Sequence, residues 1–333
     1  MRALITASFD DAAKARLARR MEVVHEDWKV RQSIYFDGAE FAARIRSVGA
    51  DVLVVEADLV HAEVLEGCPI VMIGCCRGDP VNIDLELATR KGIPVFHTPG
   101  RNADAVADLT LAFLLMLARH VGPIQHTFRD GAARITGAGD YLKMYSRFTG
   151  VELGGRTVGL VGLGAVGREV ATRLLAFKAR VLAYDPYVDA PPSGVKMRGL
   201  DDLLRESDFV SLHAPVTPET QNLVSRERLA LMKPTAYFVN TARAALTDED
   251  ALYEMLVTGR LAGAALDVLA QEPLQPDNRF LQLPNVLVTP HIGGATVDVT
   301  RHQSDIVVEA MERWLDGEQP RWIANPAVLA RRR

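Results

Sequence analysis

The stretch "TVGLVGLGAVGREVATRLLAF", residues 157–177, decides the fold, because it joins a strand pattern to a glycine-rich turn and then to a helix pattern. Its first five residues are apolar or small, as in a strand that is buried on both faces. Gly162 permits a tight turn, Gly164 lets the backbone approach a pyrophosphate, and Gly167 allows close packing of the helix. Free N–H groups at the start of that helix would face the anion. The stretch therefore predicts a dinucleotide-binding unit.

A second strand pattern, "RVLAYDP" (180–186), ends in Asp185, at the offset expected of an acidic residue that binds the adenosine ribose hydroxyls. This carboxylate would repel the 2′-phosphate of NADP, and no arginine follows it in "DPYVD". We therefore expect NAD rather than NADP. The alternative, a glycine turn in a protein that binds no nucleotide, is disfavoured by this context.

Outward from this stretch, strand and helix patterns alternate along most of the chain. Strand patterns occupy residues 3–7, 21–27, 51–57, 70–76, 93–98, 157–162, 180–186, 209–215, 236–242, 263–268 and 285–290. Such alternation indicates parallel sheets covered by helices. We predict an α/β protein with two doubly wound parallel-sheet domains, one of residues 1–101 plus 295–333 and one of residues 102–294.

Three other segments have patterns of their own. A helix is predicted from Asn102, a good N-cap with Asp104 in the first turn, to about His120. Residues 122–154 contain many glycines and no clean period, so we expect an irregular arm that packs on a partner subunit. A last helix, residues 295–316, precedes "RWIANPAVL", which we expect to return to the first domain because so short a segment cannot form a third.

Composition disfavours several classes of protein. The 333 residues carry a formal charge of -4 with scattered Lys and Arg, which predicts neither nucleic acid nor an anionic membrane as partner. The most apolar segment, residues 109–118, is shorter than the roughly 20 residues of a membrane span. The N-terminus lacks the pattern of a secretion signal, so we expect a cytoplasmic protein. Adjacent Cys75 and Cys76 would point to opposite faces of a strand, which predicts core filling rather than a disulfide or a metal site.

Three strand patterns end at the edge where such a sheet binds ligands, and an ionisable residue follows each: Arg243, Glu272 and His291. A guanidinium can bind a carboxylate bidentately, an imidazole can exchange a proton, and a carboxylate can orient the imidazole and favour its charged form. Together they would suit hydride transfer beside a nicotinamide. Taken singly, Arg243 as an ion-pair partner and Glu272 as a turn residue would be the better explanations.

These residues stand in a series of segments that resembles the D-isomer-specific 2-hydroxyacid dehydrogenase family. The resemblance covers nearly the whole chain: residues 84–110, "GLGAVG", "SLHAPVTPET", "MKPTAYFVNTAR", "GAALDV", "EPL", "TPHIGG" and "NPAVL". It implies a flavodoxin-like substrate domain, a Rossmann NAD-binding domain, the cofactor in the cleft between them, and a homodimer formed through the NAD-binding domain.

The resemblance also implies an activity and its residues. The activity is NAD-dependent interconversion of a small polar D-2-hydroxy acid and its 2-oxo acid, with His291 as acid and base, Glu272 as its partner and Arg243 on the carboxylate. Besides the three glycines and Asp185, the implied cofactor site includes Thr110, Ala165, Val166, His213, Ala214, Pro215, Thr220, Thr241, Ala242, Asp267 and Gly293. For His213 a structural role is an equal alternative.

One loop departs from the family pattern. In "CRGDPVNID", Gly78 and Asp79 stand where Val and Gly are common, and Arg77 precedes them. The resemblance implies that backbone amides of this loop hold the substrate carboxylate. Arg77 could face an anionic or polyhydroxy substrate tail, or it could pair with Asp79 and shape the loop. His97, where Asn is frequent, and Ala244, where Gly is frequent, leave the implied mechanism intact.

Other functions on this fold are weaker hypotheses. Oxidation of a one-carbon acid such as formate needs no Glu–His pair of this kind, so Glu272 disfavours it. A non-enzymatic NAD-sensing interaction protein would not require Arg243, Glu272 and His291 together. A short form of phosphoglycerate dehydrogenase, without the further regulatory domain of longer ones, stays open as the specific activity. The sequence does not identify the natural 2-hydroxy acid.

Overall fold

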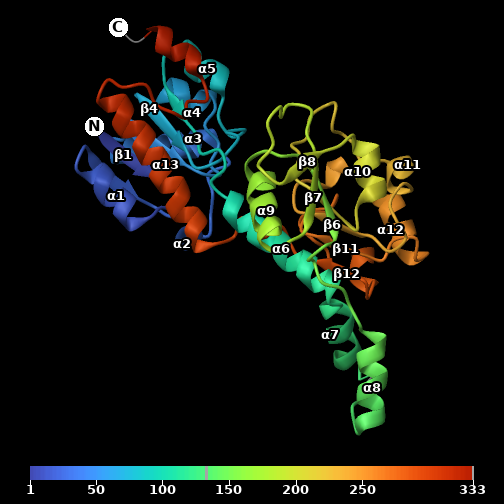
Figure 1. Ribbon diagram of the computed structural model, residues 1–333. Coiled ribbons are helices and arrows are strands. Elements are labelled where there is room, and N and C mark those ends of the chain that lie inside the picture. Colours follow the sequence, from blue (N-terminus) through green and yellow to red (C-terminus); the bar gives the residue numbers. More distant parts are fainter. Residues whose placement is uncertain (132–133, 332–333) are drawn as a thin grey trace. The chain divides into compact units, whose positions relative to one another are not determined.

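A computed structural model describes residues 1–131 and 134–331 and confirms the predicted α/β architecture with two parallel sheets (Figure 1). Positions 132–133, in the stretch predicted to be irregular, and 332–333, at the end of the predicted substrate domain, lie outside the described residues. The chain forms two compact units, which we call the first unit (Met1–Arg101 with Thr296–Arg333) and the second unit (Asn102–Ala295).

The first unit is built on a five-stranded sheet in the order β2-β1-β3-β4-β5, with every neighbouring pair parallel. This is the strand order of flavodoxin-like folds. Its strands are β1 (Arg2–Ile5), β2 (Glu22–His25), β3 (Val52–Val55), β4 (Met72–Cys75) and β5 (Val95–Phe96). Its helices are α1 (Asp11–Ala18), α2 (Trp28–Arg31), α3 (Gly38–Val48), α4 (Ala62–Gly67), α5 (Leu85–Arg90), α13 (Val297–Leu315) and the 3-10 helix η3 (Pro326–Arg331).

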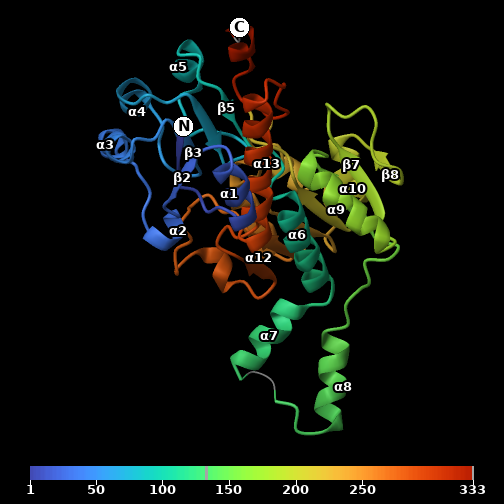
Figure 2. The same ribbon diagram turned by 90° about the vertical axis from the view of Figure 1, so that its left-hand side faces the viewer.

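Helices cover both faces of this sheet (Figure 2). One core contains residues of α3, α4 and α5, such as Phe41 and Leu65, and the other contains Val307 and Met311 of α13. Cys75 lies in the first core and Cys76 in the second, and both are fully buried free thiols. The prediction that the two cysteines fill the core on opposite faces is therefore confirmed. Burial raises the pKa of the Cys75 thiol to about 12, which makes this thiol unreactive at neutral pH.

The second unit is built on a seven-stranded parallel sheet in the order β12-β11-β10-β9-β6-β7-β8. Its strands are β6 (Thr157–Val161), β7 (Arg180–Tyr184), β8 (Val195–Met197), β9 (Phe209–Leu212), β10 (Tyr237–Asn240), β11 (Gly263–Leu266) and β12 (Val286–Val288). Its α-helices are α6 (Ala103–Ala118), α7 (Val121–Arg129), α8 (Ala138–Arg147), α9 (Ala165–Ala176), α10 (Leu200–Glu206), α11 (Arg226–Leu229) and α12 (Glu249–Val257). Two 3-10 helices complete it: η1 (Ala244–Leu246) and η2 (Arg279–Gln282).

The strand order of this sheet reverses between β6 and β9, which is the point where doubly wound folds bind dinucleotides. β6 leads through the glycine-rich turn into α9, as the sequence predicts. The edge strand β8 was not predicted, because its three residues, Val-Lys-Met, are too few to show a strand pattern.

The helix predicted from Asn102 is α6, which begins at the next residue and ends at Ala118. Asn102 occupies the N-cap position, but its side chain makes no capping hydrogen bond. Much of α6 is buried, including Val106, Thr110 and Leu114. In the described part of the chain no single helix could span a membrane, whereas α6 and α7 together, bent by 67°, would suffice by length and composition alone.

The prediction of an irregular arm at residues 122–154 is wrong, because most of this segment is helical. Figures 1 and 2 show α7 and α8 side by side, projecting away from the seven-stranded sheet. Both helices are amphipathic, but each is short and bordered by glycines such as Gly131 and Gly137, so neither gave a recognisable helical period.

Candidate active site

Three neighbouring strands of the second unit, β10, β11 and β12, deliver the predicted reaction residues. Because the strands are parallel and adjacent, their carboxyl ends meet at one edge of the sheet. Arg243 follows β10, Glu272 follows β11 and His291 follows β12. The topology thus explains why residues far apart in sequence share one edge.

The structure brings His291 and Glu272 into direct contact, with His291 Nδ1 at 2.8 Å from Glu272 Oε2. A carboxylate only accepts hydrogen bonds, so Nδ1 carries the hydrogen and donates it. The other carboxylate oxygen, Oε1, accepts a hydrogen bond from Leu269 N at 3.3 Å. The backbone N–H of Leu269 therefore orients the Glu272 carboxylate, and the carboxylate orients the imidazole. Nε2 of the ring is left to exchange a proton. The two side chains are 44% and 40% exposed, so a substrate can reach them.

His291 is held in a strained backbone conformation. Its φ is +55°, in the left-handed region that residues other than glycine rarely adopt. Its N–H donates to Asp267 O at 2.8 Å, which holds the turn. Strain of this kind persists where the surrounding structure enforces it, and it is frequent at active sites.

The carboxylate of Asp267 organises the same turn, a role that the sequence did not reveal. Asp267 is 1% exposed. Its Oδ1 accepts hydrogen bonds from Thr289 Oγ1 at 2.6 Å and Ile292 N at 2.8 Å, and its Oδ2 accepts one from Gly293 N at 2.8 Å. These bonds span the turn on both sides of His291, so Asp267 acts on the imidazole through the backbone.

Arg243 is exposed at the end of a turn that Asn240 shapes. Asn240 is 2% exposed; its Nδ2 donates to Arg243 O at 2.9 Å and its Oδ1 accepts from Ala242 N at 3.0 Å. The guanidinium donates to Ala242 O at 2.7 Å and, among the described residues, forms no ion pair with an acid. It is thus a cation available to an anionic ligand. Sequence reasoning missed Asn240. The sign in the sequence that could have indicated it is a polar residue at the last position of a buried strand.

A pocket of about 370 Å³ opens beside the imidazole. His291, Glu272 and Asp267 line it together with Leu269, Pro273, Leu274, Thr289 and Pro290. Leucine and proline side chains therefore form its apolar walls, and Asp267 and Thr289 are polar lining residues beside the His291–Glu272 pair. Arg243 does not line this pocket, so the structure brings two of the three predicted reaction residues together and leaves the third on the neighbouring strand end.

The glycine-rich turn has the dimensions that a dinucleotide requires. A Cβ at Gly162, whose φ is +98°, would lie 2.6 Å from Ala214 N, and one at Gly167 would lie 2.2 Å from Gly162 O. A Cβ at Gly164, the N-cap of α9, would meet no atom within 4 Å. Gly162 and Gly167 are therefore packed against neighbouring backbone, whereas Gly164 borders open space. The first-turn amides of Ala165 and Val166 are left for an anion. The turn fits the pyrophosphate of NAD.

Asp185 is fixed at the end of β7 by two backbone amides. Its Oδ2 accepts from Leu163 N at 2.8 Å and its Oδ1 accepts from Tyr187 N at 3.0 Å. Each carboxylate oxygen can accept a second hydrogen bond, so ribose hydroxyls can still be bound.

His213 lies directly behind Gly162 and is neutral. Burial lowers the pKa of its imidazole to about 3. Its Nε2 lies 2.9 Å from Ser211 Oγ, while Nδ1 is buried without a partner in the described part of the chain. The unpartnered nitrogen is an unexplained polar atom at the edge of the glycine-rich turn.

The remaining residues predicted to bind the cofactor surround this turn and the neighbouring strand ends. Thr110 donates to Val106 O at 2.8 Å, so the hydroxyl of Thr241, 3.0 Å away, is the donor in the bond between the two threonines. Thr220 donates to Pro215 O at 2.7 Å and closes the turn after Ala214. Ala242 and Gly293 take part in the turns of Arg243 and His291.

In the first unit, Arg77, Gly78 and Asp79 form the loop after β4, at the carboxyl edge of that sheet. The neighbouring segment after β5 holds the loop: Thr98 N donates to Arg77 O at 2.8 Å, and His97 Nδ1 lies 2.9 Å from Gly78 O. Among the ion pairs of the described residues there is none between Arg77 and Asp79, so the structure gives no support to the pairing considered from the sequence.

Comparisons with known proteins relate the chain to one family. Residues 111–293 match the model of the family "D-isomer specific 2-hydroxyacid dehydrogenase, NAD binding domain". The chain is 37% identical to a glyoxylate reductase of Thermofilum pendens, over 92% of this chain and 89% of that one. It is 40% identical to a hydroxypyruvate reductase of Thermotoga maritima, over 78% and 83% of the two chains. The crystal structure of the TT0316 protein from Thermus thermophilus is similar with a TM-score of 0.81 at 38% identity, covering 97% of this chain and 100% of that one.

Proposed function

The chain belongs to the D-isomer-specific 2-hydroxyacid dehydrogenase family and is an NAD-dependent oxidoreductase of 2-hydroxy and 2-oxo acids, and from this premise we propose that His291, Glu272 and Arg243 perform its reaction. The observation that carries the proposal is the 2.8 Å contact between His291 Nδ1 and Glu272, which leaves Nε2 free. We further propose a small polar 2-oxo acid as substrate, since the relatives include reductases named for glyoxylate and hydroxypyruvate.

Each residue has a separate task in the reduction direction. Arg243 binds the substrate carboxylate through its exposed guanidinium and thereby polarises the adjacent carbonyl. The glycine-rich turn and Asp185 would hold NADH, which would provide the hydride for the keto carbon. His291 donates the proton from Nε2 to the substrate oxygen, and Glu272 stabilises the charged imidazole that holds this proton. Asp267 keeps the ring in place through the turn.

The cofactor and the substrate would use the residues predicted for them. The glycine-rich turn with Ala165 and Val166 would bind the pyrophosphate, and Asp185 would bind the adenosine ribose. We propose that the backbone amides of the loop Arg77–Asp79 contribute to holding the substrate carboxylate.

The test of these roles is a His291→Gln variant assayed with glyoxylate and hydroxypyruvate. Glutamine keeps a polar side chain of similar length but cannot exchange a proton, so kcat should fall by roughly 100-fold or more, since general acid–base catalysis contributes 10²–10⁴. NADH binding, measured by fluorescence titration, should stay within about twofold. Unchanged turnover would show that another group transfers the proton, and loss of NADH binding would show that the substitution damaged the cofactor site.

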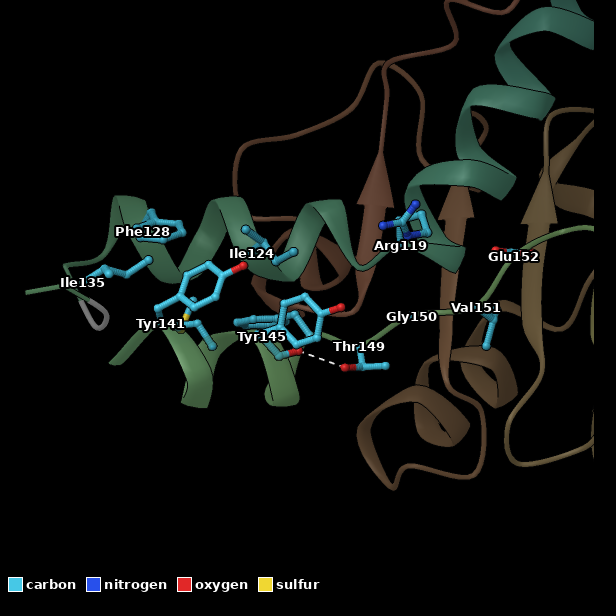
Figure 3. A pocket seen from close by; sticks show the side chains of 12 residues that line it. Arg119, Ile124, Phe128, Ile135, Tyr141, Tyr145, Thr149, Gly150, Val151 and Glu152 are labelled. Atoms are coloured by element: carbon cyan, nitrogen blue, oxygen red, sulfur yellow. Dashed lines mark hydrogen bonds between the residues drawn. The ribbon is translucent and has the colours of Figure 1, made fainter. Parts of the chain in front are cut away.

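We also propose that the protein is a homodimer and that the arm formed by α7 and α8 takes part in the interface. Figure 3 shows Ile124 and Phe128 of α7 and Tyr141 and Tyr145 of α8 around a pocket of about 460 Å³. The exposed fractions of Tyr141 and Tyr145 are 54% and 68%, and that of Leu142 is 62%. Apolar surface of this extent on a projecting arm favours burial against a second chain.

Light scattering of the wild-type protein and of a Leu142→Asp/Tyr145→Asp variant tests the dimer. The wild type should have twice the chain mass, and the variant should dissociate into monomers because two charges cannot be buried without partners. A Val257→Asp variant, at an exposed position of α12, is the matched control and should stay dimeric. A monomeric wild type would contradict the proposal.

The three free thiols further support a proposed location in the reducing cytoplasm.

A further inference from the structure

The loop Arg77–Asp79 of the first unit is held by hydrogen bonds to its backbone carbonyls. Thr98 N–H donates to Arg77 O at 2.8 Å. His97 Nδ1 donates to Gly78 O at 2.9 Å, since a carbonyl oxygen only accepts. A Cβ at Gly78 would lie 3.6 Å from Pro99 Cα, so the two segments are in contact along their backbones. The conformation of the loop is therefore set from the neighbouring strand end, and its side chains are not needed to maintain it.

The side chain of Arg77 is a cation for which the described residues supply no partner. It is partly buried, yet within the described ranges its guanidinium makes no hydrogen bond and no ion pair. Arg101, in the same unit, shows the usual arrangement: it pairs with Glu56 at 3.2 Å and with Gln303. The nitrogens of this guanidinium are not among the buried polar atoms that lack a partner, so the cation stays accessible and can form charge-assisted hydrogen bonds with an anion.

Nearby groups do not neutralise Arg77. Glu56, after β3, is occupied by Arg101 and by Trp28 Nε1 at 2.9 Å. The hydroxyl of Thr98 is an unsatisfied group at this loop: it is fully buried and has no hydrogen-bond partner in the described part of the chain. Buried polar groups without partners are uncommon in native proteins and call for an explanation such as a ligand. An accessible cation and a buried hydroxyl without a partner among the described residues thus lie on adjoining loops at the carboxyl edge, where a doubly wound sheet binds ligands.

We propose that Arg77 makes the enzyme selective for 2-oxo acids that carry a second anionic group, a carboxylate or a phosphate, at the end opposite to the reacting carboxylate. His97 is a positioning residue for this subsite, because its bond to Gly78 fixes the loop that presents Arg77. The proposal rests on the proposed function, in which this loop contributes to substrate binding. Asp79 is exposed and unpaired among the described residues, and its charge opposes an anionic tail, so it limits the affinity that Arg77 provides.

The test compares 2-oxo acids that carry a charged tail with related 2-oxo acids whose tail is neutral. One pair is 2-oxoglutarate and its 5-monomethyl ester, whose tail is neutral; the other is phosphohydroxypyruvate and hydroxypyruvate, which lacks the phosphate. The wild type should use the charged member of at least one pair with a kcat/KM about tenfold or more higher, mainly through a lower KM, because a tail contact binds ground state and transition state alike. The pair that shows the preference distinguishes a carboxylate from a phosphate tail.

Three variants assign the preference to this loop. Arg77→Gln should abolish the preference for the charged member. Asp79→Asn should lower KM for that member by about twofold, the size expected for removal of an exposed like charge. Lys91→Gln, which removes one exposed positive charge from the same unit, is the matched control and should keep the wild-type preference.

His97 is tested by rescue. His97→Asn retains a side-chain N–H that can donate to Gly78 O and should keep the preference, whereas His97→Ala should reduce it through KM with kcat nearly unchanged. Equal use of both members of each pair by the wild type, or a preference that survives Arg77→Gln, would overturn the inference. Turnover of glyoxylate separates the two proposals: if glyoxylate and hydroxypyruvate are reduced while the preference is absent, the inference fails and the proposed function stands.

Discussion

The turn that carries His291 depends on one buried carboxylate, and Asp267→Asn should show how much. Asparagine has the shape of aspartate but has one acceptor oxygen and an NH₂ group. In the better orientation its oxygen keeps the bonds from Thr289 and Ile292, and its NH₂ group then faces the N–H of Gly293. At least one charge-assisted hydrogen bond is lost, and one buried N–H loses its partner.

The size of the effect follows from these contacts. A hydrogen bond to a charged group contributes about 1.5–3 kcal/mol, so with the unsatisfied N–H the free energy of unfolding should fall by about 3 kcal/mol. For a unit of about 200 residues each kcal/mol lowers Tm by roughly 2–4 °C, which predicts a decrease of roughly 6–12 °C. The strained φ of His291 would relax, and a displacement of about 1 Å at a catalytic group costs roughly 100-fold in rate.

The assay combines thermal unfolding with steady-state kinetics on glyoxylate. The control is Asp250→Asn, which removes an equal charge from a 76% exposed residue paired with Arg279 and should change stability by less than about 1 kcal/mol. If Asp267→Asn has the Tm and kcat of this control, the carboxylate does not hold the turn and the reasoning is refuted. If Tm falls while kcat is unchanged, the hydrogen bonds stabilise the fold but do not position His291.

Two further predictions concern the dinucleotide turn. Gly164→Ala should leave Tm unchanged, because the added Cβ meets no atom within 4 Å, but it should weaken NADH binding at least tenfold in a fluorescence titration. Gly167→Ala should instead lower Tm strongly, because the added Cβ would lie 2.2 Å from Gly162 O. The pKa of His213 in the folded chain is about 3, below the ordinary 6.5. Between these two pH values the unfolded chain binds a proton at His213 that the folded chain does not bind. The stability that the neutral imidazole contributes is therefore lost as pH falls from 6.5 towards 3. The slope is about 1.4 kcal/mol per pH unit, and urea unfolding of His213→Gln at pH 6.5 and 5.0 should show a smaller loss of stability than the wild type.

The fold was predictable because its evidence is local. Buried strands such as residues 157–161 and 263–266 are continuous apolar runs, and a GxGxxG turn between strand and helix has few other uses. The helices α7 and α8 were not predictable in this way, because both are short and apolar residues such as Leu142 and Tyr145 remain exposed. The helical period of a segment is interpreted against an expected core, and α8 has no buried residue among those that the structure describes.

The candidate site was predictable as a set of residue types and not as a set of contacts. Arg243, Glu272 and His291 could be chosen because each follows a strand pattern, which places them at one edge of the sheet. The roles of Asn240 and Asp267 could not be chosen, since both depend on which backbone amides the turns bring to their side chains. Polar residues at the ends of buried strands are ambiguous in sequence, because capping a turn and binding a ligand require the same chemistry.

The left-handed backbone of His291 shows why this distinction matters for function. A glycine would adopt φ of +55° without strain, so stability alone does not favour histidine at this position. The strain is tolerated because Asp267 binds the turn through its backbone oxygen and through both carboxylate oxygens. In return, the imidazole is held by the backbone as well as by Glu272, and the freedom of Nε2 is reduced before any substrate binds. The proposed proton transfer would benefit from such preorganisation, and this gives a physical reason to find a histidine where the backbone favours glycine.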